Sequence, residues 1–184
     1  MPGSPSTRSI RKRLVDADDH FDITPLPEFD DARLGSINLR LGNTFLIARR
    51  ASVSSIEAQD VRASQRLFDE VRLPGREPLV LQPQQFALAT TFEYLSLPAD
   101  LCGFIQSRST YGRMGLIAAT ATYVTAGYHG CPTLEIVNAG EVAVVVRPGE
   151  AICQLVLITA GEEPGDLHPS RYQCTVRPYP ARRM

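Results

Sequence analysis

From residue 74 onward, the sequence is a series of short apolar runs separated by glycine and proline. Runs of this length and spacing are typical of an all-β sandwich or barrel, and they disfavour a fold in which strands alternate with helices. We expect strands at 78–81, 86–97, 103–106, 116–124, 133–137, 142–146 and 151–159. The sequence therefore predicts a mostly β domain.

The β pattern begins earlier, near residue 35. Ile37, Leu39 and Leu41 alternate with polar residues or glycine, as in a half-buried strand. This start divides the chain into an N-terminal arm (1–34), a β domain (35–160) and a tail (161–184).

The arm and the tail differ from the β domain in composition. A short helix is expected from Ser6 or Thr7 to about Leu14, with Ile10 and Leu14 on one face. The acidic remainder of the arm is predicted to be a loop. The Pro-rich tail is expected to become ordered only against another surface, and residues 49–65 have no assignment.

Composition narrows the classes of partner. The net charge of −1 provides no basic field for nucleic acid, and there is no run of 18 apolar residues to span a membrane. The basic N-terminus lacks the apolar core of a signal peptide, so we expect a cytoplasmic protein. No cysteine pair has CxxC spacing and no histidines have HxxxH spacing, which disfavours a zinc site.

One polar segment, Ser-Arg-Ser-Thr-Tyr-Gly-Arg-Met-Gly at 107–115, has the composition of a phosphate site. Arg108 and Arg113 provide guanidinium donors, while Ser109 and Thr110 provide short hydroxyl donors. A short helical turn starting near Ser109 would also direct backbone N–H groups toward an anion. The alternative is a polar loop between two strands.

A second segment places an acid within an apolar strand. In the run 133–137, Thr133, Glu135 and Val137 should share one strand face, with Leu134 and Ile136 on the other. A carboxylate in a partly dry cavity is a usable general base or acid, whereas one facing solvent has no such role. Just before it, the turn 127–130 carries Tyr128, which could stack on a sugar or base, or could simply pack.

Together these segments resemble the dCTP deaminases, relatives of the trimeric dUTPases. The resemblance rests on 37–42, 97–98, 107–115, 120–121, 127–130, 133–138, 147–149, 154–155 and 171–173. It implies a distorted β-barrel or jelly-roll of the dUTPase type and a homotrimer with sites between subunits. It also implies zinc-independent hydrolytic deamination of dCTP to dUTP, with Mg²⁺ bound through the triphosphate of this deoxycytidine nucleotide.

The resemblance also implies roles for individual residues. Glu135 would be the general base, Ser109 and the backbone carbonyl of Ala121 would hold the attacking water, and Arg113 would lie beside Glu135. Arg108, Ser109 and Thr110 would bind phosphates. The other expected substrate contacts are Tyr111, Gly112, Arg113, Thr125, Tyr128, Thr133, Leu134, Arg171 and Tyr172.

The chain departs from the family pattern at several positions. Thr125 stands where an acidic residue is usual, Arg171 replaces a lysine, and Thr175 replaces the later glutamine of the tail motif. Alternatives to a dCTP deaminase therefore stay open. One is a relative that also cleaves dUTP or has a shifted substrate, and another is a nucleotide-binding trimer without turnover.

Overall fold

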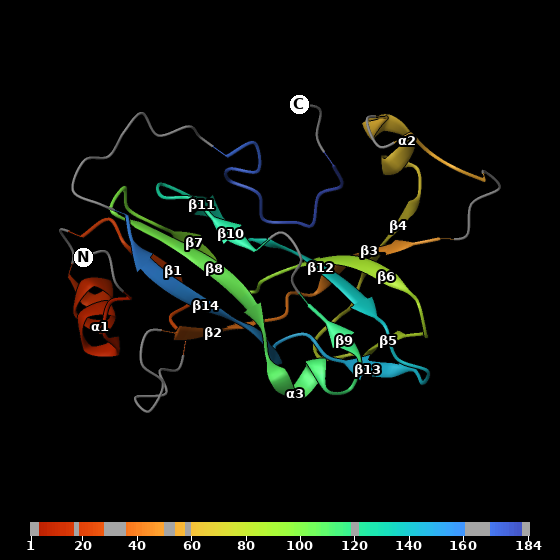
Figure 1. Cartoon of the computed structure of the whole chain (residues 1–184), viewed down its shortest axis with the longest axis horizontal. Helices are drawn as coiled ribbons and strands as arrows, with labels where there is room; N and C mark the ends of the chain where they lie inside the picture. The colour runs from red at the N-terminus through yellow and green to blue at the C-terminus, as the bar shows by residue number, and fades with distance from the viewer. Residues whose placement is uncertain are drawn as a thin grey trace.

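The computed structural model describes residues 4–16, 19–27, 36–49, 54–57, 60–118, 122–160 and 170–181. Most of its regular structure is β, as predicted, with three short helices among the described residues (Figure 1). The elements are α1 (Thr7–Val15), β1 (Asp22–Thr24), β2 (Ser36–Arg40), β3 (Thr44–Ala48), α2 (Val61–Gln65), β4 (Phe68–Arg72), β5 (Leu79–Leu81), β6 (Phe86–Thr90), β7 (Tyr94–Ser96), β8 (Leu101–Ser107), α3 (Ser109–Gly112), β9 (Leu116–Ile117), β10 (Tyr123–Val124), β11 (His129–Gly130), β12 (Thr133–Asn138), β13 (Val144–Val146) and β14 (Ala151–Thr159).

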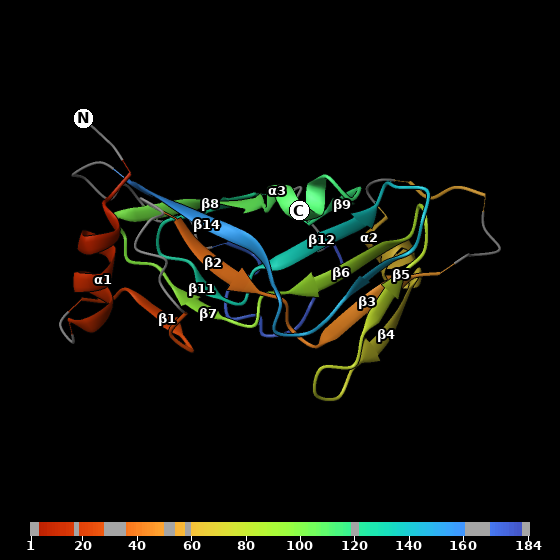
Figure 2. The same ribbon diagram turned by 90° about the horizontal axis from the view of Figure 1, so that it is seen from below.

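The strands form antiparallel sheets of orders β4-β3-β6-β12-β9, β10-β8-β14-β2 and β1-β7-β11, with a β13-β5 ribbon. Among the described strands, this pairing does not close into one continuous barrel. In both ribbon views α1 lies at one end of the molecule and β3 and β4 lie toward the other (Figures 1 and 2). The expected strands at 78–81, 103–106, 133–137, 142–146 and 151–159 all appear, shifted by at most two residues at each end.

The burial of alternate residues confirms the predicted strand faces. In β2, Ile37 and Leu39 are buried while their neighbours are half-buried. In β12, Leu134 and Ile136 face the core, and Thr133 and Glu135 are half-buried on the other face. In these two strands, the two-residue period of the sequence therefore becomes a core side and a second side.

Two predicted strands are each divided in two. The run 86–97 becomes β6 and β7 because the chain turns at Thr91–Glu93, where the buried Glu93 carboxylate accepts hydrogen bonds from Arg40 N (2.8 Å) and Nε (2.6 Å). The run 116–124 becomes β9 and β10, and residues 119–121 between them lie outside the described part.

Several elements, among them the short β11 in the expected turn 127–130, occur in segments without a predicted helix or strand. β1 occupies the supposed loop of the arm, α2 falls within the unassigned 49–65, and β4 follows it. β1 is short and has a single buried side chain, Ile23. Its sequence alone therefore contains too little periodicity to indicate a strand.

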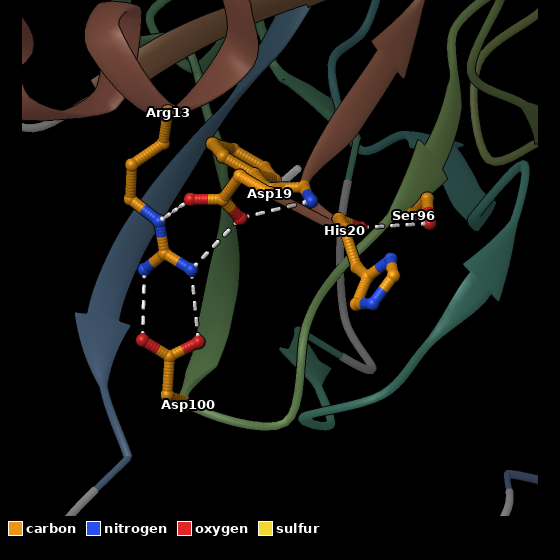
Figure 3. A network of polar contacts seen from close by, with 6 residues as sticks. Arg13, Asp19, His20, Ser96 and Asp100 are labelled. Carbon is orange, nitrogen blue, oxygen red and sulfur yellow. Dashed lines mark hydrogen bonds and ion pairs between the residues drawn. The ribbon is translucent and has the colours of Figure 1, made fainter. Parts of the chain in front are cut away.

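The predicted N-terminal helix is present as α1, capped by Ser6, whose Oγ accepts a hydrogen bond from Ser9 N at 3.2 Å. Its Ile10 is only 1% exposed, and Leu14 packs at the core margin. Arg13 contacts Asp19 (Nε–Oδ2, 2.5 Å) and forms two hydrogen bonds with Asp100 (2.8 and 2.9 Å) (Figure 3). The Arg13 guanidinium also lowers the pKa of Asp19.

Candidate active site

A cavity of about 390 Å³ lies between strands of the two largest sheets and the C-terminal segment. It is lined by Leu88, Ile105, Tyr123, Val124, Thr125, Tyr128, Pro132, Thr133, Glu135, Ser170, Tyr172, Tyr179 and Ala181. Within this described lining, Glu135 is the one carboxylate, and lysine, arginine and histidine are absent. Four tyrosines and several aliphatic side chains supply the rest of the wall, so the cavity suits an uncharged, planar group.

Glu135 reaches the cavity because of its place in β12. The strand pairs with β6, where Glu135 lies opposite Leu88, and Leu88 lines the same cavity. Leu134 and Ile136 anchor the other face of β12 in the core. A carboxylate fixed in this way on a central strand, and half-shielded from water, can accept and return a proton at a bound ligand.

Two buried hydroxyls point to a polar ligand. Thr125 Oγ1 and Thr133 Oγ1 are both shielded from solvent, and neither has a hydrogen-bond partner within the described ranges. Both residues line the cavity with Glu135. A buried hydroxyl without a partner costs about 1–3 kcal/mol, which a ligand with donors and acceptors would recover.

Tyr128 lies largely within the protein. It is 6% exposed, and burial raises the pKa of its hydroxyl to about 12. Gly130, at φ 143°, allows this packing, since a Cβ there would lie 3.0 Å from the Tyr128 hydroxyl and 3.1 Å from the Thr175 carbonyl. Tyr128 therefore packs in the core, as one interpretation of its turn predicts, and it also lines the cavity.

The C-terminal segment closes one side of the cavity and is tied to the Tyr128 turn. Gln173 holds the turn with both ends of its amide: Oε1 accepts from His129 N (2.7 Å) and Nε2 donates to Gly127 O (2.8 Å). Main-chain hydrogen bonds of 2.7 Å join Cys174 N to His129 O, and Cys131 N to Thr175 O. Residues 170–181 of the tail therefore lie against another surface of the protein, as expected.

The structure brings together only some of the predicted site residues. Glu135, Thr125, Tyr128, Thr133 and Tyr172 line the cavity. The lining also includes residues that the motifs did not indicate, among them Ser170 and Tyr179 of the tail. No local sequence pattern marks these two, because their place depends on how the tail folds back.

The other predicted residues lie elsewhere on the chain. The segment that carries Arg108, Ser109, Thr110, Tyr111, Gly112 and Arg113 forms the end of β8 and the short helix α3, and none of these residues lines the cavity of its own chain. Ser109, Thr110, Gly112 and Arg113 are exposed there. The Leu134 side chain faces the core, Arg171 is exposed, and Ala121 lies outside the described residues.

Comparisons with known proteins agree with this architecture. The sequence model of a family described as dCTP deaminase-like matches residues 6–160. A dUMP-forming dCTP deaminase of Sulfurihydrogenibium sp. (strain YO3AOP1) is 37% identical over 168 residues, covering 90% of this chain and 89% of the relative. A dCTP deaminase of Natronomonas pharaonis is 37% identical over 186 residues, covering 96% and 93%.

Solved structures support the fold. The 2′-deoxycytidine 5′-triphosphate deaminase from Agrobacterium tumefaciens superposes with a TM-score of 0.65 at 24% identity, covering 86% of this chain and 47% of that one. The native EIAV dUTPase superposes with a TM-score of 0.50 at 13% identity, covering 80% and 95%. The predicted dUTPase-like β fold is confirmed. Among the described helices, none is long and apolar enough to cross a membrane.

Proposed function

Because this chain belongs to the dCTP deaminase-like family, we propose that it catalyses the hydrolytic deamination of dCTP. The observation that carries the proposal is Glu135, the one carboxylate in the described lining of an otherwise uncharged, tyrosine-rich cavity. Such a cavity suits a nucleoside, and Glu135 would transfer protons at the base.

In the proposed reaction, Glu135 takes a proton from water as the water oxygen bonds to C4 of cytosine. The glutamate passes this proton to N3, then takes the second proton from the new C4 hydroxyl and delivers it to the amino group, which leaves as ammonia as the C4–N bond breaks and the C4 carbonyl forms. The balance is dCTP and water giving dUTP and ammonia. The orphaned hydroxyls of Thr125 and Thr133 would bind polar groups of the nucleoside, because each can act as donor or acceptor.

Binding a triphosphate requires positively charged side chains, and the described lining of the cavity in one chain contains none. Arg108, Ser109, Thr110 and Arg113 lie at α3, but none of them lines the Glu135 cavity of the same chain. We therefore propose a homotrimer in which α3 of one subunit meets the cavity of another, bringing Ser109 and Arg113 to Glu135. The Ala121 carbonyl would help to hold the water.

Magnesium is proposed to arrive with the substrate, as Mg·dCTP. The described residues contain no group of three histidine, cysteine, aspartate or glutamate side chains arranged to hold a metal ion. The triphosphate oxygens would supply most of the magnesium ligands. The proposed phosphate-binding residues of the protein would contact the remaining negative charge of the triphosphate.

A second step, cleavage of dUTP to dUMP and pyrophosphate, is the other candidate. It is favoured by relatives at 35–37% identity that are named dUMP-forming, from Sulfurihydrogenibium, Methanobrevibacter smithii and Persephonella marina. Against it, Thr125 stands where the family usually has the acid that activates water in dUTPases. A chain forming dUMP would need another base for that step.

Glu135→Gln is expected to lower the rate of deamination by about 10²–10⁴-fold while leaving dCTP affinity nearly unchanged. The amide preserves the size of the side chain but cannot accept the proton. Steady-state release of ammonia and calorimetric titration with Mg·dCTP measure the two quantities. Glu141→Gln, at an exposed carboxylate, is the matched control. Full activity of Glu135→Gln would remove this residue from the mechanism.

The direct test is to incubate the protein with Mg·dCTP and separate the products by ion-exchange chromatography. dUTP as the end product would establish deamination alone, and dUMP with pyrophosphate would establish both steps. Binding of dCTP without any product would favour the nucleotide-binding trimer without turnover.

A further inference from the structure

The short strand β10 carries the most exposed of the four tyrosines in the described lining of the Glu135 cavity. Tyr123 is 56% exposed, compared with 40% for Tyr179, while Tyr172 is half-buried and Tyr128 is buried. More than half of the Tyr123 side chain is therefore left for a ligand to cover. A flat ring of this kind suits a planar partner.

The backbone around Tyr123 is held on both sides of the residue. β10 pairs with β8, so that Tyr123 lies opposite Phe104. On one side, Thr122 O accepts a hydrogen bond from Ile105 N at 2.8 Å, and on the other side the Val124 side chain is buried. The two-residue strand is thus fixed by pairing before Tyr123 and by burial after it.

The Tyr123 ring is also held by a neighbouring ring. The Phe104 and Tyr123 ring centroids lie 5.3 Å apart, and the ring planes are tilted by 50°. This cross-strand aromatic pair stabilises one orientation of Tyr123 but leaves much of its surface open. A side chain that is already oriented loses little conformational freedom when a ligand packs on it, so its contact contributes more to affinity.

The proposed chemistry decides which part of the substrate an aromatic wall can contact. Glu135 is proposed to transfer protons at N3 and at the amino group, which both lie on the edge of the cytosine ring. Water attacks C4 from one face of that ring, so the opposite face is open to stacking. Lysine, arginine and histidine are absent from the described lining, so the cavity suits the base better than the phosphates.

We propose that Tyr123 is a substrate-binding residue that stacks on the face of the cytosine ring opposite the attacking water. The inference rests on the proposed function and extends it, because it assigns the base to the Tyr123 wall of the cavity. Stacking contacts the substrate and the transition state alike, so it lowers KM without raising kcat. Tyr123 and Glu135 should therefore affect different kinetic constants.

The first test compares two variants of Tyr123. Tyr123→Leu removes the aromatic face but keeps an apolar side chain against Phe104, and Tyr123→Phe keeps the face. Tyr123→Leu is expected to raise the KM for Mg·dCTP and the Kd for dUTP by about fivefold to a hundredfold, without lowering kcat. Tyr123→Phe should bind like the wild type. Phe92→Leu, at an exposed ring outside the described cavity lining, is the matched control.

The second test changes the ligand instead of the protein. Dihydro-dUTP, in which the C5–C6 double bond is saturated, keeps the hydrogen-bonding edge of dUTP but has a puckered ring that is not aromatic. The wild type should bind dUTP more tightly than dihydro-dUTP, whereas Tyr123→Leu should bind the two nearly equally, because both changes remove the same contact. Calorimetric titration measures the four affinities.

Equal binding of dUTP and dihydro-dUTP by the wild type would overturn the inference, and so would unchanged affinity in Tyr123→Leu. An equal loss in Tyr123→Phe would assign the effect to the hydroxyl and would also overturn it. The same holds if Tyr123→Leu dissociates a wild-type oligomer in light scattering, since the ring would then cover a subunit contact.

The two proposals can fail separately. A wild-type protein that binds dCTP without deaminating it would end the proposed function, while the dUTP affinities would still decide the role of Tyr123. A wild-type protein that binds neither nucleotide would overturn both.

Discussion

The two ends of the chain both lie against the β structure, but they are attached by different forces (Figure 1). The N-terminal arm buries Ile10, Phe21 and Ile23, each at most 2% exposed, and adds the Arg13 ion pairs. The described tail is attached by polar contacts that include the Gln173 amide and two main-chain hydrogen bonds. Apolar burial contributes more to stability than the net value of exchanged hydrogen bonds.

The difference separates stability from function along the chain. The arm packs at the end of the molecule where its residues line no part of the Glu135 cavity, whereas Ser170, Tyr172, Tyr179 and Ala181 of the tail do line it. We infer that changes in the arm lower the free energy of unfolding without altering the site. Changes in the tail should alter nucleotide binding with little effect on global stability.

The largest effect is expected from Ile10→Ala in the arm. Removing a fully buried isoleucine side chain to Cβ costs about 2–5 kcal/mol, because apolar contacts are lost and a cavity remains. Denaturant unfolding measures this loss, and Arg8→Ala on the exposed face of α1 is the control. The KM for dCTP of the folded protein should stay at its wild-type value. A large change in KM would mean that the arm communicates with the site.

Arg13→Gln is expected to lower the free energy of unfolding by a smaller amount, about 1–3 kcal/mol at neutral pH. The reason is that the carboxylates of Asp19 and Asp100 both lose the Arg13 guanidinium. The folded pKa of Asp19 is lowered by Arg13, so the stabilisation is present above the unfolded pKa near 4 and is lost as pH falls through the folded pKa. Unfolding curves of both proteins from pH 7 downward should therefore converge in acid. A gap that stays constant to low pH would show that the charge of Asp19 is not involved.

The arm and the tail also differ in what the sequence could reveal. The capped, amphipathic α1 follows from Ser6, Ile10 and Leu14, because helical signals are local. The same holds for the strand face that carries Glu135, since a two-residue period fixes which side chains share a face. The cavity itself was not predictable, because it joins residues from separate strands and from the tail.

The phosphate segment illustrates the same limit. The pattern at 107–115 predicted a short helical turn near Ser109, and α3 confirms that prediction. Its distance from Glu135 within one chain depends on sheet order, which local patterns do not specify.

The smallest effect on stability, and the sharpest test of the comparison, is expected from Gln173→Ala. The variant loses the two hydrogen bonds that Gln173 makes with Gly127 and His129. These bonds hold the turn that positions Tyr128 at the cavity. Each such bond contributes about 0.5–1.5 kcal/mol to holding the tail against the turn, so the KM for dCTP should rise by about twofold to tenfold. The melting temperature should stay close to that of the wild type, because the tail can detach locally while the core stays folded. Gln82→Ala, at an exposed glutamine in another loop, is the control for the loss of a side-chain amide. If Gln173→Ala instead lowered the melting temperature as much as Ile10→Ala and left KM unchanged, the tail would belong with the arm as a structural support.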